Sequence, residues 1–297
     1  MSELIESGST FVEPAPSALD EEVQEILLKI DKSAESAPKG PKVTQSAIKG
    51  FFDDTKCKIR WSRIYQNGEQ IDDSDPEGVL NKGLYFEYHL LGATRDGKPP
   101  KPFPLTNRGG KYKWHEDLDN QIEEARMVMK KLQIKPVRIQ GEITAGTDQA
   151  HYDLIALFED PQHLSTLNLN QTSLCLFDIK WTETRKDDKW KGWAEPEYNQ
   201  DAMIQAKHYI HVFFKATGVL IPFYFLVFGK TGWVRLIRVG VTDGALAAHH
   251  NLILRYQQKL QEFQPYPIRD WETCLSCGFL SSCEYSVDRP IVQEILI

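Results

Sequence analysis

The sequence of 297 residues lacks the marks of a membrane protein, a secreted protein or an ATP-driven enzyme. Its longest apolar run, VLIPFYFLVFG, contains a proline and is shorter than the ~20 residues of a membrane-spanning helix. The N-terminal MSELIESGST has no basic region followed by an apolar stretch, so we do not interpret it as a secretory signal. No G-x-x-x-x-G-K-[ST] loop occurs, so any use of ATP would come from a partner. We expect a cytoplasmic protein, or one of a host cytoplasm if a phage encodes it, with no membrane contact.

Cysteine is scarce, with five residues in the whole chain. Three of them, Cys274, Cys277 and Cys283, fall within ten positions in ETCLSCGFLSSC. In a reducing compartment disulfides are rare, and clustered cysteines more often bind a metal. Zinc and cubane iron–sulfur sites both use four ligands, so this segment supplies three and requires one more.

Net positive charge is also absent, because the formal net charge is -7. Residues 1–40 hold nine acids and three lysines, which leaves the remaining 257 residues near -1. The overall charge therefore neither favours nor excludes nucleic acid as a partner of residues 41–297. Residues 1–40 are rich in serine, proline and acids, which predicts an acidic flexible tail. The alternative is that SALDEEVQEILLKI forms an amphipathic helix that docks a partner.

Helix and strand patterns alternate along residues 41–297 in a single domain. Helical spacing of apolar residues predicts helices over 116–132, 198–218 and 243–263. Short apolar runs predict strands over 137–144, 152–160, 173–184, 220–229 and 232–242. The order αβββαββα predicts an α/β domain with a central mixed sheet flanked by helices. The Pro/Gly-rich loop TRDGKPPKPFPLTNRGGKYKW is long for a compact domain, so it is either functional or mobile.

The stretch LCLFDIKWTE is the most informative. Alternation along a strand places Asp178 and Lys180 on the same face as Leu174 and Leu176. A carboxylate and an amine are costly on an apolar face unless they are used. Asp178 can bind a hard divalent cation, and Lys180 can orient a water or help to deprotonate it. A D-x-K sequence also occurs by chance, and a solvated pair on an edge strand would look the same.

Other acids could join this pair. Asp153 lies at the head of a predicted strand and would meet Asp178 if the two strands pair. Glu142 or Asp148 would replace it if the strand alignment shifted. Glu87 could complete the group from an earlier helix, with His89 as its rival, whereas Glu183 is expected to be solvated.

Four motifs in order resemble the PD-(D/E)XK nuclease superfamily, in its RecB-like iron–sulfur branch of CRISPR-associated, AddB-type and phage nucleases. The resemblance covers roughly residues 43–285. The motifs are G-x-x-x-E from Gly83 to Glu87, DLIA at Asp153, DIK at Asp178 and Lys180, and Q-x-x-x-Y at Gln205 and Tyr209.

The resemblance implies a metal-dependent phosphodiesterase with a restriction-endonuclease-like fold. In that family pattern Glu87, Asp153, Asp178 and the backbone carbonyl of Ile179 would hold Mg²⁺ or Mn²⁺. Lys180 would lie beside the attacking water, and Gln205 and Tyr209 would position DNA. Many relatives have histidine where this chain has Glu87.

The resemblance also implies a fourth cysteine ligand, Cys57, which follows a predicted amphipathic helix. Cys57, Cys274, Cys277 and Cys283 would then hold a [4Fe–4S] cluster that joins the N- and C-terminal parts of the domain. Zinc suits four thiolates equally well, and free structural thiols are a further alternative. Cys175 is expected in the core.

Two groups allow a structural and a functional interpretation. The histidine pairs of KHYIH and LAAHHNLIL are expected on helix faces or in the core rather than on a metal. The segment CKIRWSRIY could hold single-stranded DNA by charge and stacking, or form a packed helix. The residues concerned are His208, His211, His249, His250, Lys58, Arg60, Trp61, Arg63 and Tyr65.

We therefore expect a DNA nuclease, an exonuclease or a single-strand-specific enzyme, that acts in recombination, replication, repair or spacer acquisition. Its DNA would be single-stranded or have a free end, and a helicase or recombination protein would be a partner. One alternative is a catalytically silent DNA-binding partner of such a protein. Another is a restriction-like endonuclease with a zinc staple.

Overall fold

The computed structural model describes residues 19–70, 78–93, 99–158, 174–184, 193–267, 274 and 277–285. These residues contain a five-stranded sheet in the order β1-β2-β3-β4-β5. The strands are β1 (Lys135–Ala145), β2 (Asp148–Leu157), β3 (Leu174–Thr182), β4 (Phe223–Gly229) and β5 (Val234–Val239). Neighbouring strands pair antiparallel except β3 and β4, which are parallel and are connected through α6 (Gln200–Thr217).

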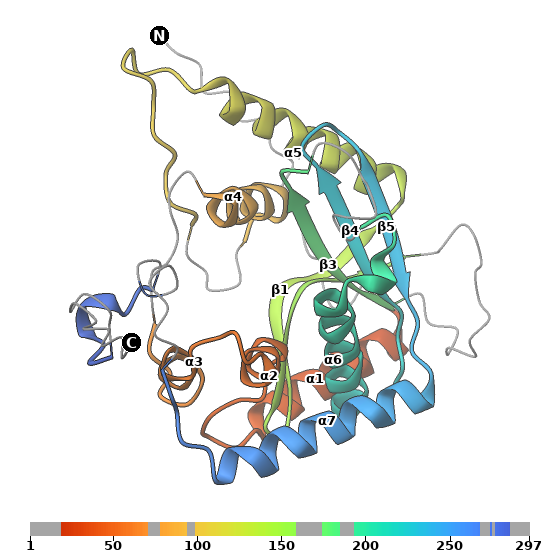
Figure 1. The fold of residues 1–297 in the computed structure, drawn as a ribbon. Helices are drawn as coiled ribbons and strands as arrows, with labels where there is room; N and C mark the ends of the chain where they lie inside the picture. The colour runs from red at the N-terminus through yellow and green to blue at the C-terminus, as the bar shows by residue number, and fades with distance from the viewer. Residues whose placement is uncertain are drawn as a thin grey trace, which may run out of the picture.

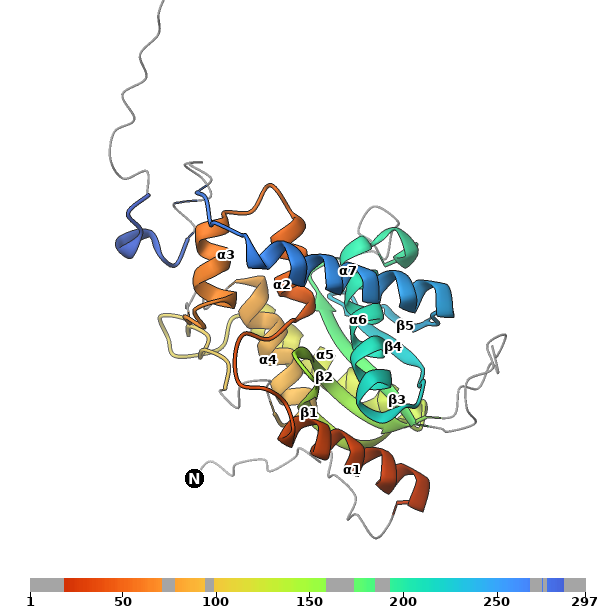
Figure 2. The same ribbon diagram turned by 90° about the horizontal axis from the view of Figure 1, so that it is seen from below.

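Helices cover both faces of this sheet (Figure 1). On one face, α1 (Glu21–Glu35) and α6 share a core with the sheet. On the other, α4 (Val79–Leu91) and α5 (Lys113–Lys131) form a second core. A smaller third core joins α2 (Gln45–Phe52), α3 (Lys58–Tyr65) and α7 (Asp243–Gln261). Figure 2 shows α7 lying across α2 and α6.

The predicted α/β class with a mixed sheet is confirmed, and the order αβββαββα is found from α5 to α7. The alternation predicted for β3 is also present. Leu176 belongs to the α6-side core, whereas Phe177 and Ile179 belong to the α4/α5-side core together with Cys175. Because β3 has a strand on each side and helices on both faces, Leu174–Ile179 is buried throughout. Two short 3-10 turns, η3 (Pro196–Tyr198) and η4 (Leu280–Ser282), complete the described elements.

Residues 21–35 form α1, so the amphipathic helix of the alternative interpretation is present there and the tail prediction is wrong for this segment. That this helix docks a partner stays a prediction. Val23, Ile26 and Ile30 of α1 are buried because their helical spacing puts them on one face against the sheet. Arg138 of β1 donates two hydrogen bonds of 2.8 Å to the Asp31 carboxylate. The acids within this helix, Glu21, Glu22, Glu25, Asp31 and Glu35, are exposed. Residues 1–18 fall outside the described residues.

No helix in the described part of the chain combines the length and the apolar composition needed to cross a membrane.

Candidate active site

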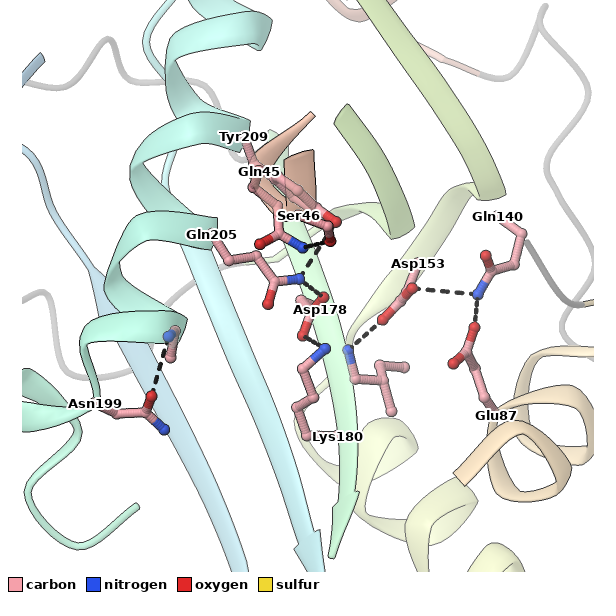
Figure 3. Close-up of polar contacts among 12 residues, drawn as sticks. Gln45, Ser46, Glu87, Gln140, Asp153, Asp178, Lys180, Asn199, Gln205 and Tyr209 are labelled. Carbon is pink, nitrogen blue, oxygen red and sulfur yellow. Dashed lines mark hydrogen bonds and ion pairs between the residues drawn. The ribbon is translucent and has the colours of Figure 1, made fainter. Parts of the chain in front are cut away.

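The D-x-K pair lies at the centre of the sheet, on the face that α6 covers (Figure 3). Asp178 is only 2% exposed, and its Oδ2 lies 2.5 Å from Lys180 Nζ. Its Oδ1 accepts a hydrogen bond of 2.5 Å from Gln205 Nε2 of α6. Gln205 Nε2 also lies 3.3 Å from the hydroxyl of Tyr209, one turn further along α6. Four residues predicted from two separate motifs thus form one hydrogen-bonded group.

Asp153 reaches β3 from the neighbouring strand. The register pairs Leu154 with Phe177, so Asp153 lies at the next position, beside Asp178. Its Oδ2 accepts a hydrogen bond of 2.6 Å from the backbone N–H of Ile179. The predicted pairing of these two strands is therefore present.

The other two acids considered for this position have different surroundings. Asp148 is buried at the opposite end of β2, 2.7 Å from Lys215 Nζ. Glu142 of β1 accepts a hydrogen bond of 3.2 Å from Thr144 Oγ1. Neither takes the place of Asp153 beside the D-x-K pair.

Glu87 joins the group from α4 through a residue that sequence reasoning missed. Gln140 of β1 donates from Nε2 to Glu87 Oε1 and to Asp153 Oδ1, the latter at 3.3 Å (Figure 3). The backbone of Gln140 has φ 45°, a left-handed conformation that is uncommon outside glycine. Such conformations cost free energy and persist only where the surrounding structure holds them, and they cluster at functional sites. His89, the rival of Glu87, instead packs its ring 4.1 Å from that of Tyr85.

The electrostatics follow from crowding several charges in a buried space. Burial, and then the Glu87 and Asp178 carboxylates, raise the pKa of Asp153 well above its usual value. Burial would lower the pKa of Lys180, but Asp178 and Asp153 outweigh it and raise that pKa. Lys180 therefore remains an ammonium group. Burial, with Asp178 and Asp153, likewise raises the pKa of Tyr209, which stays a neutral phenol.

The oxygen donors of Glu87, Asp153 and Asp178 have the chemistry that a hard divalent cation requires. The raised pKa of Asp153 agrees with this, because a nearby cation would offset the carboxylates that crowd it. As the side chains stand, no three His, Cys, Asp or Glu groups of the described residues converge closely enough to hold an ion. Binding would require Glu87 and Asp153 to turn from Gln140, and Asp178 to turn from Lys180.

The start of α2 reaches the same group and was also missed from the sequence. Figure 3 shows Gln45 and Ser46 pointing toward Gln205 and Tyr209. Gln45 Nε2 lies 2.7 Å from Ser46 Oγ, and Gln45 Oε1 is buried with no hydrogen-bond partner among the described residues. The sequence offered only a helix-start signal, Thr44, whose side chain caps α2 by accepting from the N–H of Ala47.

All five cysteines are free of disulfides, and Cys175 lies in the core on β3 as expected. Cys57 is the residue immediately before α3, and the N–H of Cys277 bonds to the carbonyl of Cys274 at 3.0 Å. The C-terminal segment packs on α3 through Arg63, which lies 3.9 Å from the Phe279 ring centroid and donates to Ser282 Oγ at 2.9 Å. The predicted four-cysteine ligand set stays a prediction.

The segment CKIRWSRIY forms α3, and two of its residues are core residues rather than a DNA-binding surface. Lys58 is 1% exposed, with Nζ bonded to the carbonyls of Gly50 at 2.9 Å and Asp53 at 2.6 Å. Trp61 is 3% exposed and donates from Nε1 to the carbonyl of Ala47 at 2.8 Å. The packed-helix alternative therefore holds for these two residues.

The histidine pairs lie between α6 and α7, as the structural alternative predicted. His208 is fully buried and His249 is 3% exposed. His208 Nδ1 lies 3.1 Å from His249 Nε2, and His208 Nε2 lies 2.9 Å from the carbonyl oxygen of Gln149.

No protein-family model and no curated protein matches this sequence. Among solved structures, the chain is similar to a candidate exonuclease from Eubacterium rectale, with a TM-score of 0.52 and 18% identity over 94% of this chain and 96% of that one. It is more distantly similar to SSO0001, with a TM-score of 0.34 and 10% identity over 90% of this chain and 97% of that one. The first comparison shows that the fold is shared, and the second supports no argument.

Proposed function

We propose that this chain is a divalent-metal-dependent DNA nuclease that hydrolyses phosphodiester bonds, with the specificity of an exonuclease or a single-strand-specific enzyme. The observation that carries the proposal is the meeting of Glu87, Asp153, Asp178, Lys180 and Gln205 around one strand. The motifs that supply them lie far apart in the sequence. The fold shared with a candidate exonuclease supports the proposal.

In this mechanism Mg²⁺ or Mn²⁺, held by Glu87, Asp153, Asp178 and the Ile179 carbonyl, would supply an activated water and offset charge on the phosphate. Lys180 acts as a hydrogen-bond donor to that water and to the phosphate, because its raised pKa keeps it protonated. It is therefore not the general base in this arrangement. A cation that binds Asp178 would offset the charge of this carboxylate, so Asp178 would raise the pKa of Lys180 less.

The remaining residues position these groups. Gln205 fixes one oxygen of Asp178, and the Ile179 N–H fixes one oxygen of Asp153. Tyr209, a neutral phenol that is only 5% exposed, supports Gln205 from the core through its hydroxyl. Gln140 holds Glu87 and Asp153 at a common point from which they can turn toward a cation.

The test is cleavage of end-labelled single- and double-stranded DNA by the full chain, with Mg²⁺, with Mn²⁺ and with a chelator. We expect cleavage that needs the metal and that falls by at least about a hundredfold in Asp178→Asn, as losses of transition-state electrostatics do. Glu25→Gln, on the exposed face of α1, is the matched control that removes one carboxylate and should retain activity.

Three outcomes would contradict the proposal. An absence of cleavage on every DNA would favour the silent DNA-binding alternative. Full activity of Asp178→Asn would place the chemistry elsewhere. Sequence-specific double-strand cuts would favour the restriction-like alternative.

We further propose that Cys57, Cys274, Cys277 and Cys283 hold a structural [4Fe–4S] cluster, away from the acids. Four thiolates suit iron–sulfur and zinc equally, and the contact of Arg63 with Phe279 and Ser282 supports a joint between α3 and the C-terminal segment. Protein purified without oxygen should absorb near about 400 nm and contain iron and sulfide. Cys57→Ser should lose that absorbance. A colourless, zinc-loaded protein would replace iron–sulfur with zinc.

As part of the nuclease proposal, we propose that the protein acts in DNA recombination, replication, repair or spacer acquisition. Recombination, replication, repair and spacer acquisition all present single strands or free ends, and each would pair this chain with a helicase or recombination protein. The chain has no phosphate-binding loop of its own to use ATP.

A further inference from the structure

The long loop before α5 is held by specific contacts, and its exposed face has no role in the candidate active site. Its described part, residues 99–112, is called the strap here. Asn81, a buried residue of α4, holds the strap with two hydrogen bonds, from Nδ2 to the Lys101 carbonyl at 3.0 Å and to Oδ1 from the Lys101 N–H at 2.9 Å. Phe103 is 7% exposed and packs against the rings of Tyr85, Trp114 and His115.

The outer end of the strap is a defined turn. The Thr106 N–H bonds to the Gly110 carbonyl at 2.8 Å, and the Gly109 N–H bonds back to the Thr106 carbonyl at 2.8 Å. Gly109 has φ +76°, which favours glycine at this position. Phe103 and Asn81 therefore anchor the strap, and the turn holds its far end in one shape.

The outward face carries basic side chains and aromatic rings, and one of these bases, Lys113, pairs with Asp117 of α5 at 3.3 Å. Between residues 99 and 115 there is no acidic residue, in a chain whose formal net charge is -7. Tyr112 is 39% exposed, and its ring stacks on Trp114 with 6.2 Å between centroids and 11° between planes. Lys82 Nζ lies 4.9 Å from the centroid of the Trp114 ring. The bases of this segment are Lys101, Arg108, Lys111 and Lys113.

This face is tied to the strand that carries the D-x-K pair. Lys82, beside Trp114, also pairs with Glu183 at 2.7 Å, three residues beyond Lys180. Glu183, which was expected to be solvated, therefore links α4 to the end of β3. Glu87 lies one and a half turns further along the same α4 helix. Figure 1 shows the strap running past α4 to the start of α5.

We infer that the strap surface, made of Lys82, Arg108, Lys111, Tyr112 and Trp114, binds single-stranded nucleic acid and leads it toward the site. Bases stack on aromatic rings without regard to sequence, and cations beside the rings bind the phosphates. Lys82 and Lys111 are already paired with Glu183 and Asp119, so their contributions are smaller than that of the exposed Arg108. This inference rests on the proposed nuclease function.

The experiment measures binding of a labelled oligothymidylate by fluorescence anisotropy, with the full chain in a chelator so that nothing is cleaved. Tyr112→Ala should weaken binding about tenfold, as expected for loss of one stacked base. Tyr112→Phe, which keeps the ring, should stay within about twofold. Phe214→Ala removes an aromatic ring of similar exposure (41%) from the last turns of α6 and should bind as the wild type does.

Charge is tested separately. A plot of log affinity against log salt concentration has a negative slope. Arg108→Ala should make this slope shallower by about 0.7, the value for one phosphate contact on a single strand. Duplex DNA of the same length should bind more weakly than the single strand.

The failure of this inference differs from the failure of the nuclease proposal. Wild-type affinity in Tyr112→Ala, or equal binding of duplex and single strand, would overturn the strap surface even if the wild type cleaves DNA. Binding that falls in Tyr112→Ala, in a protein that cleaves no DNA, would support the surface and overturn the nuclease.

Discussion

Asp153 of β2 accepts a hydrogen bond of 2.6 Å from the backbone N–H of Ile179, the central residue of D-x-K on β3. One carboxylate is thereby fixed against the strand that carries the other. Asp153 is half-buried, and desolvation, followed by the nearby Glu87 and Asp178 carboxylates, raises its pKa. Repulsion among these carboxylates lowers the stability of the metal-free protein.

Asp153→Asn should stabilise the metal-free protein and abolish cleavage. The amide oxygen can still accept from Ile179 N–H, while the repulsion from Glu87 and Asp178 disappears. We expect a gain of about 1 kcal/mol in the free energy of unfolding, within the ~0.5–2 kcal/mol that single stabilising changes commonly give. Urea unfolding in a chelator measures it. Glu25→Gln, an exposed acid of α1, should change stability by less than about 0.5 kcal/mol.

A stability equal to or below that of the wild type would show that Asp153 is not under electrostatic strain. Retained cleavage would remove it from the catalytic group.

Lys180→Met should both inactivate and destabilise the protein. Its Nζ lies 2.5 Å from Asp178, which is 2% exposed and would lose this cationic partner. Because the lysine side chain is 35% exposed, water screens the pair, and we expect a loss of about 1–3 kcal/mol. Lys180→Arg keeps the charge, so it should lose less stability while still losing activity through altered geometry. Urea unfolding of both variants is the measurement, and equal stability of Lys180→Met and the wild type would contradict it.

Sequence reasoning predicted the sheet, the flanking helices and most of the acidic group, because each depends on a local pattern. The alternation of β3 showed which face Asp178 and Lys180 occupy, and helical spacing put Gln205 with Tyr209. It missed Gln140, whose role depends on the cross-strand position opposite Asp153 and on a left-handed backbone that no residue type announces.

At the N-terminus, the average composition hid a local helical pattern. The composition of residues 1–40 is acidic, and the tail prediction followed from that average. The apolar stripe of α1 is buried because it packs against β1 and α6. Its residues are Val23, Ile26, Leu27 and Ile30. The same holds for Gln45 and Ser46, which reach the site only because α2 packs on α6, where Lys49 pairs with Asp201 at 2.9 Å.

Mg²⁺ or Mn²⁺ should raise the melting temperature of the wild type and not that of Asp153→Asn. A ligand that binds only the folded state adds stability, about 2.7 kcal/mol at a hundred times its dissociation constant. The carboxylates that repel one another gain the most from the cation. Differential scanning fluorimetry with and without each metal measures this shift independently of cleavage. Equal shifts in both proteins would place the cation elsewhere.

Acid should destabilise the protein through the histidines between α6 and α7. The Gln149 carbonyl requires a proton on His208 Nε2, so His208 Nδ1 accepts from His249 Nε2. Protonating His208 would require His249 to change tautomer, and protonating both rings would set two N–H groups against each other. Burial, the largest cause, lowers the pKa of His208 to about 4 and that of His249 to about 3. Near these rings, Asp148 opposes the decrease, while His211 adds to it.

Both folded pKa values lie below the value of about 6.5 in the unfolded chain, so the unfolded state binds more protons between about pH 4 and pH 6.5. Stability is therefore complete above that window and falls as the pH decreases through it. We expect a loss of about 2 kcal/mol between about pH 7.5 and about pH 5.5, allowing for coupling of the two rings. The raised pKa of Asp153 acts in the opposite direction, so the measurement compares variants. His249→Gln can still donate to His208 Nδ1 but cannot titrate, and urea unfolding should show about half the wild-type loss. An unchanged loss in this variant would mean that other groups set the acid sensitivity.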